Sequence, residues 1–175
     1  LAQRAPRAAL NAARQATKID PFNARLWTHL AQTQEALGEN PEASYRRAIE
    51  LQPTRAANRL NLADWLAREN APAADDVYSR AVELDPNGTV TRLARAQWRL
   101  AHGDARGWDD LEYIVRLRDE PYGRYPALDE ETFVNLDFTR AALKLAERAV
   151  QQDDEEKARR YLPRIETDLA QARKI

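Results

Sequence analysis

Apolar residues recur along most of the chain with the three- and four-residue spacing of one face of an α-helix. One such stretch runs from Leu26 to Leu37, and a second runs from Ala43 to Ile49. Gly38 and Pro41 separate them, and these residue types favour the end of one helix and the start of the next. The pattern therefore predicts two short helices joined by a tight turn. The sequence contains no run of alternating β-branched residues of the kind that predicts a β-strand.

This predicted pair of helices recurs along the chain. The phrase YRRAIELQP ends at Pro53, and the similar phrase YSRAVELDP ends at Pro86. Together with Pro21 and Pro121, these prolines punctuate the chain at spacings of 32, 33 and 35 residues. A period of this length is typical of stacked helical hairpins, because one hairpin cannot bury its apolar face alone. Alanines beside large apolar residues let neighbouring helices approach closely.

The repeated residues resemble the tetratricopeptide repeat, in which small and large apolar residues hold fixed positions on two helices and a proline follows. The matching residues are Trp27, Leu30, Ala31, Tyr45, Ala48 and Pro53, then Leu62, Ala63, Leu66, Ala74, Tyr78, Ala81 and Pro86, and in a looser third copy Leu93, Ala96, Leu100, Gly103, Val115 and Pro121. The resemblance covers roughly residues 5–120. It implies an all-α fold, a right-handed superhelical solenoid of helix hairpins.

We expect a single domain of this type over residues 1–175. Its predicted parts are a half repeat at 2–20, repeats at 22–53 and 54–86, a looser repeat at 87–121 and a capping helix pair at 129–175. The capping helices are expected at about 130–151 and 154–173, because a terminal hairpin must cover the open end of the stack. The segment DEPYGRYPALDEE before them is interpreted as a connector that packs Tyr122 and Tyr125 against this hairpin. A tyrosine-bearing docking loop is the alternative.

Composition narrows the classes of function. A net charge of −1 over 175 residues offers no overall field for binding nucleic acid or an anionic membrane surface. The absence of cysteine excludes disulfides and cysteine metal sites. No apolar run approaches the roughly 18 residues of a membrane span, so no direct membrane contact is expected. No signal peptide is visible. Because the sequence opens on Leu1 without a methionine, we expect a fragment or a processed product.

Candidate catalytic chemistry is sparse. His29 and His102 come from different repeats, and no HExxH pattern supplies further metal ligands. The carboxylates lie among arginines, and the acidic run at 153–156 suits the start of a helix without catalysis. No glycine-rich phosphate loop or nucleophile elbow is present. We therefore expect no catalytic residue, no metal and no cofactor in this segment, although a parent chain could carry an enzyme elsewhere.

The resemblance implies a concave groove lined by the first helix of each pair, in which extended peptides or helices are held. Helical phase assigns the groove positions, and the predicted partner groove comprises Arg25, Thr28, His29, Gln32, Asn61, Asp64, Arg68, Arg95, Trp98 and His102. Arginine pairs well with carboxylates and tryptophan anchors interfaces, so Arg25, Arg95 and Trp98 suit an acidic or aromatic peptide. The alternative is that Trp98 belongs to the core and the arginines are solvated.

Some members of this family hold the C-terminal tails of chaperones in a basic carboxylate clamp. Of the positions involved, only Asn61 fits, whereas Thr28, Gln32 and Leu60 do not. Binding of chaperone tails is therefore disfavoured.

Three functions remain open. The first is a non-catalytic protein–protein interaction scaffold that binds a peptide or partner protein through the groove. The second follows from the tail, which is similar to the soluble C-terminal regions of bacterial O-antigen ligase-like membrane proteins. This resemblance implies that the chain is an extracytoplasmic, non-catalytic part of a glycan-transfer enzyme. The third is a self-assembling adaptor, because an open solenoid end can dock onto another copy. A bacterial cytoplasm and a periplasm both fit, with or without tethering to a membrane through an upstream segment.

Overall fold

Helices are the only regular elements in the residues that the structure describes. This computed structural model describes residues 4–119 and 136–172, and every element in these ranges is an α-helix. The predicted connector around Tyr122 and Tyr125 lies outside these ranges. The chain divides into two compact units, Leu1–Pro86 (unit 1) and Asn87–Ile175 (unit 2).

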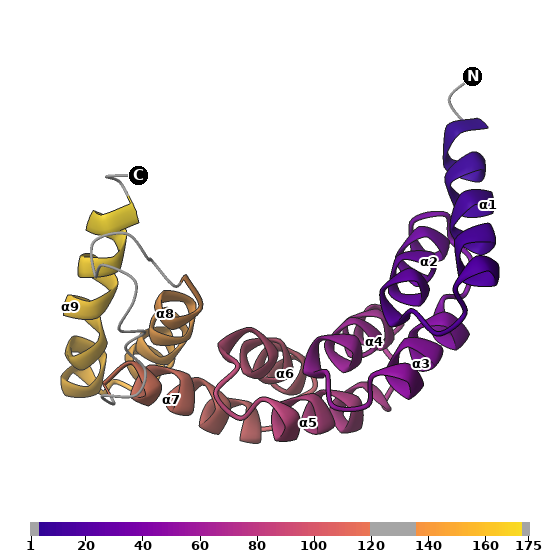
Figure 1. The fold of residues 1–175 in the computed structure, drawn as a ribbon. Coiled ribbons are helices and arrows are strands. Elements are labelled where there is room, and N and C mark those ends of the chain that lie inside the picture. The colour runs from indigo at the N-terminus through magenta and orange to yellow at the C-terminus, as the bar shows by residue number, and fades with distance from the viewer. Residues whose placement is uncertain (1–3, 120–135, 173–175) are drawn as a thin grey trace. The chain divides into compact units, whose positions relative to one another are not determined.

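Unit 1 contains five helices in the described residues. They are α1 (Arg4–Ile19), α2 (Ala24–Ala36), α3 (Glu42–Leu51), α4 (Ala56–Arg68) and α5 (Ala74–Leu84). Each helix packs against the next along the chain. Within unit 1, α2 and α4 form one layer, and α1, α3 and α5 form the other (Figure 1). The predicted repeats thus place their first helices side by side in one layer.

Fully buried alanines recur at repeated positions in the helices of unit 1. Ala31, Ala48, Ala63 and Ala81 have no exposed surface. Beside them, Leu62 and Tyr78 are buried large side chains that fill the grooves between the helices. This arrangement is the expected result of the repeated small and large residues, since a methyl side chain lets two backbones approach.

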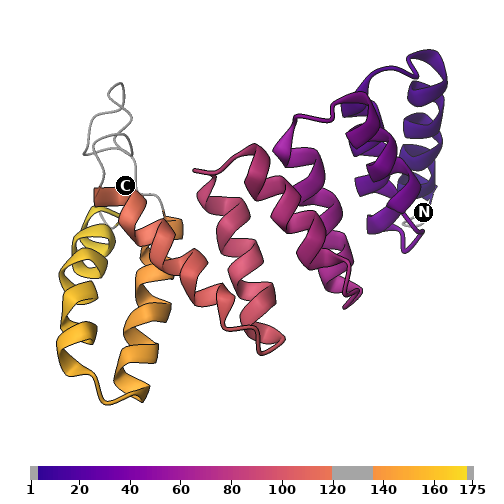
Figure 2. The same ribbon diagram turned by 90° about the horizontal axis from the view of Figure 1, so that it is seen from below.

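Unit 2 contains four helices in the described residues. They are α6 (Thr89–Ala101), α7 (Arg106–Asp119), α8 (Leu136–Gln151) and α9 (Glu155–Ala172). One core cluster joins all four, and it includes Leu93, Ala96, Leu111, Ile114, Ala142, Leu145, Tyr161 and Ile165. Figure 2 shows α8 and α9 following α7 side by side. The C-terminal hairpin therefore shares a core with the α6–α7 hairpin.

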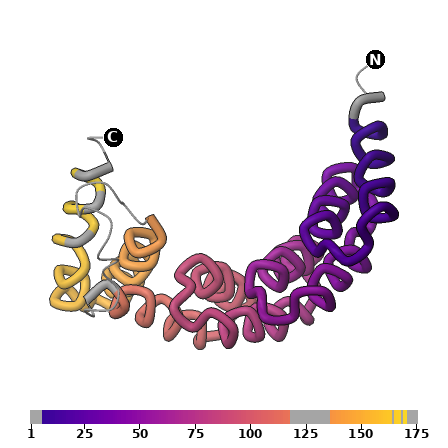
Figure 3. Tube along the Cα trace, in the orientation of Figure 1, coloured from indigo at the N-terminus to yellow at the C-terminus, as the bar shows by residue number. Residues whose placement is uncertain are grey.

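The same turn ends each even-numbered helix. Gly38, Asn70, Gly103 and Asp153 follow α2, α4, α6 and α8, and all four have positive φ values of 71°, 53°, 75° and 58°. The next residue returns its N–H to a carbonyl five positions earlier, for example Glu39 N to Gln34 O, at 2.9 Å in all four turns. This left-handed cap stops a helix by satisfying its last carbonyls. Figure 3 traces the resulting reversals of the chain.

The described residues thus form the all-α stack of helix hairpins that the repeat pattern predicts. The predicted break at Gly38 coincides with a turn between paired helices, and Gly103 of the third copy lies in the corresponding turn. The break predicted at Asp153 also lies in such a turn, so the C-terminal pair uses the same hairpin as the repeats.

Candidate peptide-binding crevice

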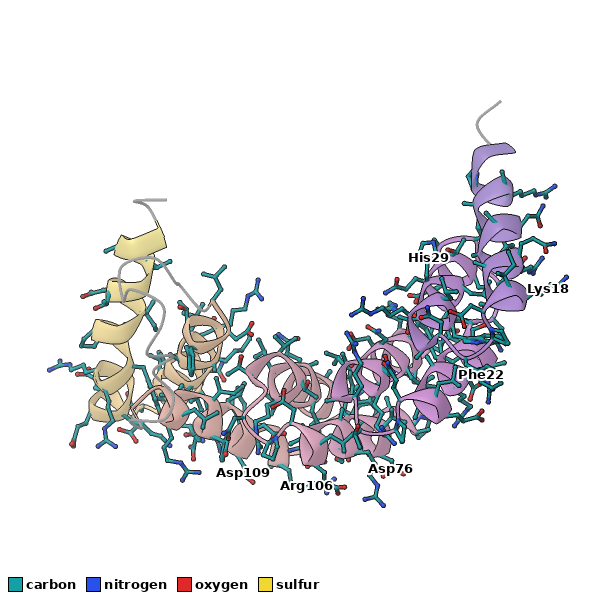
Figure 4. All side chains as sticks on the ribbon, in the orientation of Figure 1. Lys18, Phe22, His29, Asp76, Arg106 and Asp109 are labelled. Carbon is teal, nitrogen blue, oxygen red and sulfur yellow. The ribbon has the colours of Figure 1, made fainter. Side chains whose placement is uncertain are left out.

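A small open cavity of about 130 Å³ lies between α2 and α4 of unit 1. Its lining residues are Arg25, Thr28, His29, Gln32, Arg55, Ala57, Asn58 and Asn61. Five of them belong to the predicted partner groove, namely Arg25, Thr28, His29, Gln32 and Asn61. In Figure 4, His29 projects from the side of α2 that faces away from α1. We call this cavity the α2–α4 crevice.

Helical spacing explains why these residues meet. Arg25, Thr28, His29 and Gln32 are three or four positions apart, so they share one face of α2. Asn61 takes the matching position on α4, which lies in the same layer as α2. Because both helices run the same way in the repeat, their corresponding faces line the crevice together.

Two polar lining residues, Arg55 and Asn58, were missed by the sequence reasoning. Arg55 is the N-cap residue of α4, with extended backbone angles, and it precedes the first periodic position. Asn58 lies one turn before Asn61, so helical spacing could have found it. Its side-chain amide is buried and donates to the Ala48 carbonyl over 3.1 Å, which ties α4 to α3. Asn58 therefore fixes the wall of the crevice.

The charge of the crevice is positive. Arg25 and Arg55 are exposed and both line it, while no aspartate or glutamate is among its lining residues. Both arginines lie at the N-terminal ends of their helices, where the peptide dipoles leave partial positive charge. Asn23 caps α2 by accepting the Arg25 N–H over 3.2 Å, which fixes the start of that helix. The crevice is therefore suited to an anionic group.

Asp64 and Arg68, two further predicted groove residues, take part in a network beside the crevice. Tyr78 donates its hydroxyl to Asp64 over 2.8 Å, and Tyr45 donates to Glu35 over 2.9 Å. Arg68 also pairs with Glu35. The network links α2 with α3 and α4, and α4 with α5. These side chains thus hold neighbouring helices together.

Burial shifts the titration of this network. Desolvation, together with the hydrogen bonds to Glu35 and Asp64, raises the pKa of Tyr45 and of Tyr78 far above the usual tyrosine range. Burial also raises the pKa of the Asp64 carboxyl, against the opposing effects of the Tyr78 hydrogen bond and the Arg68 charge. Both tyrosines therefore stay neutral donors throughout the physiological pH range.

The predicted groove residues of unit 2 have different surroundings. Arg95 is not solvated, because its side chain is only 12% exposed and binds Asp110 through two nitrogens at 2.5 and 2.9 Å. Trp98 is half-buried and stacks on His102, with ring centroids 4.1 Å apart. His102 Nδ1 also lies 2.7 Å from the Trp98 carbonyl oxygen. Arg95 is thus tied to Asp110 of α7, whereas Trp98 and His102 contact each other at the end of α6.

Within residues 4–119 and 136–172, no group of three or more histidine, cysteine, aspartate or glutamate side chains could hold a metal ion. Among the helices of these same residues, none combines the length and the apolar character needed to cross a bilayer.

Comparison with solved structures places the fold. No family model matches the sequence, and no curated protein matches it. Two structures of MamA have TM-scores of 0.65 and 0.69, at 17% and 16% identity, covering 94% and 99% of this chain and 87% of each MamA chain. TTC0263, a thermophilic TPR protein of Thermus thermophilus, has a TM-score of 0.54 at 20% identity, covering 94% of this chain and 91% of its own.

These similarities define the class of fold, an α-solenoid of helix hairpins. More particularly, the chain has the fold of a tetratricopeptide repeat protein, as the repeated alanines, tyrosines and prolines predict.

Proposed function

We propose that the chain is a non-catalytic interaction module that holds an extended acidic peptide in the α2–α4 crevice. The observation that carries the proposal is the convergence of Arg25 and Arg55, from two different helices, on a cavity without a lining carboxylate. Charged side chains of one sign are usually dispersed or paired on a surface, so such a convergence favours a ligand of opposite charge.

Five of the lining residues have a direct role in this proposal. The guanidinium groups of Arg25 and Arg55 bind peptide carboxylates, since a planar fork suits two parallel hydrogen bonds. The amides of Gln32 and Asn61 each offer both a donor and an acceptor, which matches the alternating groups of an extended peptide backbone. The Thr28 hydroxyl already donates to Ala24 O over 3.1 Å, so it supplies an acceptor only.

The interface is small, so binding is expected to be modest and to depend on salt. A cavity of about 130 Å³ admits only a few groups of the partner at once. Because both arginines are exposed, their attraction for carboxylates is screened at high ionic strength. Weak binding of this kind is typical of transient contacts.

Fluorescence anisotropy with labelled peptides tests the proposal. A peptide of alternating acidic and apolar residues is expected to bind, whereas its lysine-substituted counterpart is not. Arg25→Glu with Arg55→Glu is expected to abolish binding, because each change reverses a charge in the crevice. Arg80→Glu on α5 is the matched control, since Arg80 is exposed and does not line the crevice. Equal loss of binding in the control, or none in the double variant, would contradict the proposal.

The two alternatives from the sequence stay predictions. Reading the gene upstream of Leu1 tests the tail of a glycan-transfer membrane protein, which requires multiple membrane spans there. Light scattering at high concentration tests the self-assembling adaptor, which requires a mass above that of one chain.

A further inference from the structure

Unit 2 contains a cavity of its own, a hollow of about 270 Å³ between α6, α7 and α8. Its lining residues are Leu93, Gln97, Leu100, Ala101, Trp108, Leu111 and Lys144. Most of this wall is hydrocarbon; Gln97 and Lys144 end in a polar group, and Trp108 carries an indole N–H. We call it the α6–α8 hollow.

The hollow lies where the residue types at aligned repeat positions change from polar to apolar. When the fully buried Ala31 of α2 is aligned with Ala96 of α6, Glu35 corresponds to Leu100. When Ala48 of α3 is aligned with Ile114 of α7, Tyr45 corresponds to Leu111.

In unit 1 the Tyr45 hydroxyl reaches Glu35 over 2.9 Å, and this pair fills the space between its helices. Two leucines at the aligned positions of unit 2 are shorter than a tyrosine and a glutamate. The space that they leave has an apolar wall, and water gains few hydrogen bonds there.

Close packing fixes the wall of the hollow. A Cβ atom on Gly107 would lie 2.7 Å from both the Ala96 carbonyl oxygen and Leu100 Cγ. Only glycine permits this approach of α7 to α6, so Leu100 is held in place. The hollow is therefore a preformed feature of the α6–α7 hairpin.

The rim on α8 carries a lysine that is paired with a glutamate of the same helix. Lys144 is 56% exposed, lines the hollow and lies 3.0 Å from Glu147. One turn further along α8, the Arg148 guanidinium lies over the Trp108 ring at 4.6 Å from its centroid. An ammonium and an amide, from Lys144 and Gln97, thus border an apolar space.

We propose that the α6–α8 hollow binds a small, free aromatic monocarboxylate, independently of the peptide crevice of unit 1. The ring occupies the space between Leu93, Leu100 and Leu111, and its carboxylate replaces Glu147 as the ion-pair partner of Lys144. The space is sufficient, since an apolar cavity of about 150 Å³ holds a benzene molecule. Trp108 offers an aromatic face or edge to the ring. A bound acid links α8 to the α6–α7 hairpin and so stabilises unit 2.

Fluorine NMR on the whole chain tests this site, with para-fluorophenylacetate as the probe and para-fluorophenethylamine as its charge-reversed counterpart. The fluorine resonance of the acid is expected to broaden and shift on addition of protein, whereas the resonance of the amine is expected to stay unchanged. The acid is also expected to raise the melting temperature. Equal binding of the two probes, or no binding of the acid at millimolar concentration, would overturn the proposal.

Two substitutions locate the site. Ala101→Trp fills the hollow from its exposed edge and is expected to abolish binding of the acid, whereas Ala36→Trp at the aligned position of α2 is expected to leave it unchanged. Lys144→Gln is expected to weaken binding about tenfold, through loss of a charge-assisted hydrogen bond. Circular dichroism confirms the fold of each variant. Because Lys144 is exposed, its variant keeps the test decisive even if the tryptophan variant fails to fold.

Discussion

The two units build the same hairpin around different buried groups. In unit 1, α4 carries Leu62 and Leu66 in the core. When Ala63 is aligned with Ala96, the corresponding residues of α6 are Arg95 and Arg99, which bind the buried carboxylate of Asp110. One pair of positions thus holds apolar side chains in one repeat and guanidinium groups in the next. The backbone geometry tolerates both, provided that the buried charges have partners.

Charged residues at these positions replace apolar packing between the helices with ion pairs. Apolar burial is non-directional and tolerates repacking, whereas a buried ion cluster requires each member. Asp110 is only 3% exposed and accepts hydrogen bonds from Arg92, Arg95 and Arg99. Unit 2 is therefore expected to depend on one carboxylate.

The largest expected effect comes from removing that carboxylate. Asp110→Asn is expected to lower the free energy of unfolding by about 3–5 kcal/mol, because it leaves buried guanidinium groups without this negative partner. Chemical denaturation measures the change. Asp109→Asn is the matched control, since Asp109 is adjacent and exposed (Figure 4). A loss of less than about 1 kcal/mol in the Asp110 variant, a value typical of surface pairs, would contradict a buried cluster.

High pH is expected to affect unit 1 through its tyrosine network. The folded-state pKa values of Tyr45 and Tyr78 are raised, so above pH about 10 the unfolded chain releases protons that the folded chain keeps. The contribution of these tyrosines to the free energy of unfolding is therefore at its maximum below this pH. It falls as pH rises, by up to about 1.4 kcal/mol per pH unit for each tyrosine.

Denaturation between neutral pH and pH 11 measures this fall. In Tyr45→Phe with Tyr78→Phe, neither side chain titrates, so the dependence on pH is expected to be shallower. A dependence as steep as that of the unsubstituted chain would show that other groups cause it.

The smallest expected effects concern the turns that the two units share. Asn70 and Gly103 both have positive φ, but only glycine adopts this conformation without steric cost. Asn70→Gly is expected to stabilise the chain by about 0.5 kcal/mol, and Gly103→Ala to destabilise it by about 1 kcal/mol. A Cβ on Gly103 meets no atom within 4 Å, so backbone strain alone accounts for the loss. Melting temperatures of the two variants should shift in opposite directions.

The sequence predicts the fold well because the fold depends on short-range signals. Ala31 and Ala63 mark the close contacts, and Gly38 and Asn70 mark the turns, all within one period of the repeat. Stacking then follows from the apolar faces that each hairpin leaves.

The candidate site is predicted only in part. Helical phase brings together Arg25 and Gln32, because it depends on one helix alone. It does not reveal that Arg68 reaches Glu35 or that Asp64 accepts from Tyr78, since these contacts depend on the reach of side chains between helices. The sequence also does not predict the buried ion pair between Arg95 and Asp110, because nothing in the sequence distinguishes Asp110 from the other acidic residues.

A nuclear magnetic resonance titration with the acidic peptide tests the central claim most directly. Backbone amide shifts of the isotope-labelled chain are followed as the unlabelled peptide is added. We expect shifts confined to α2 and the first half of α4, centred on Arg25, Arg55 and Asn61, that weaken as salt is raised. Shifts centred on the outer helices α3 and α5, or shifts that salt leaves unchanged, would contradict it.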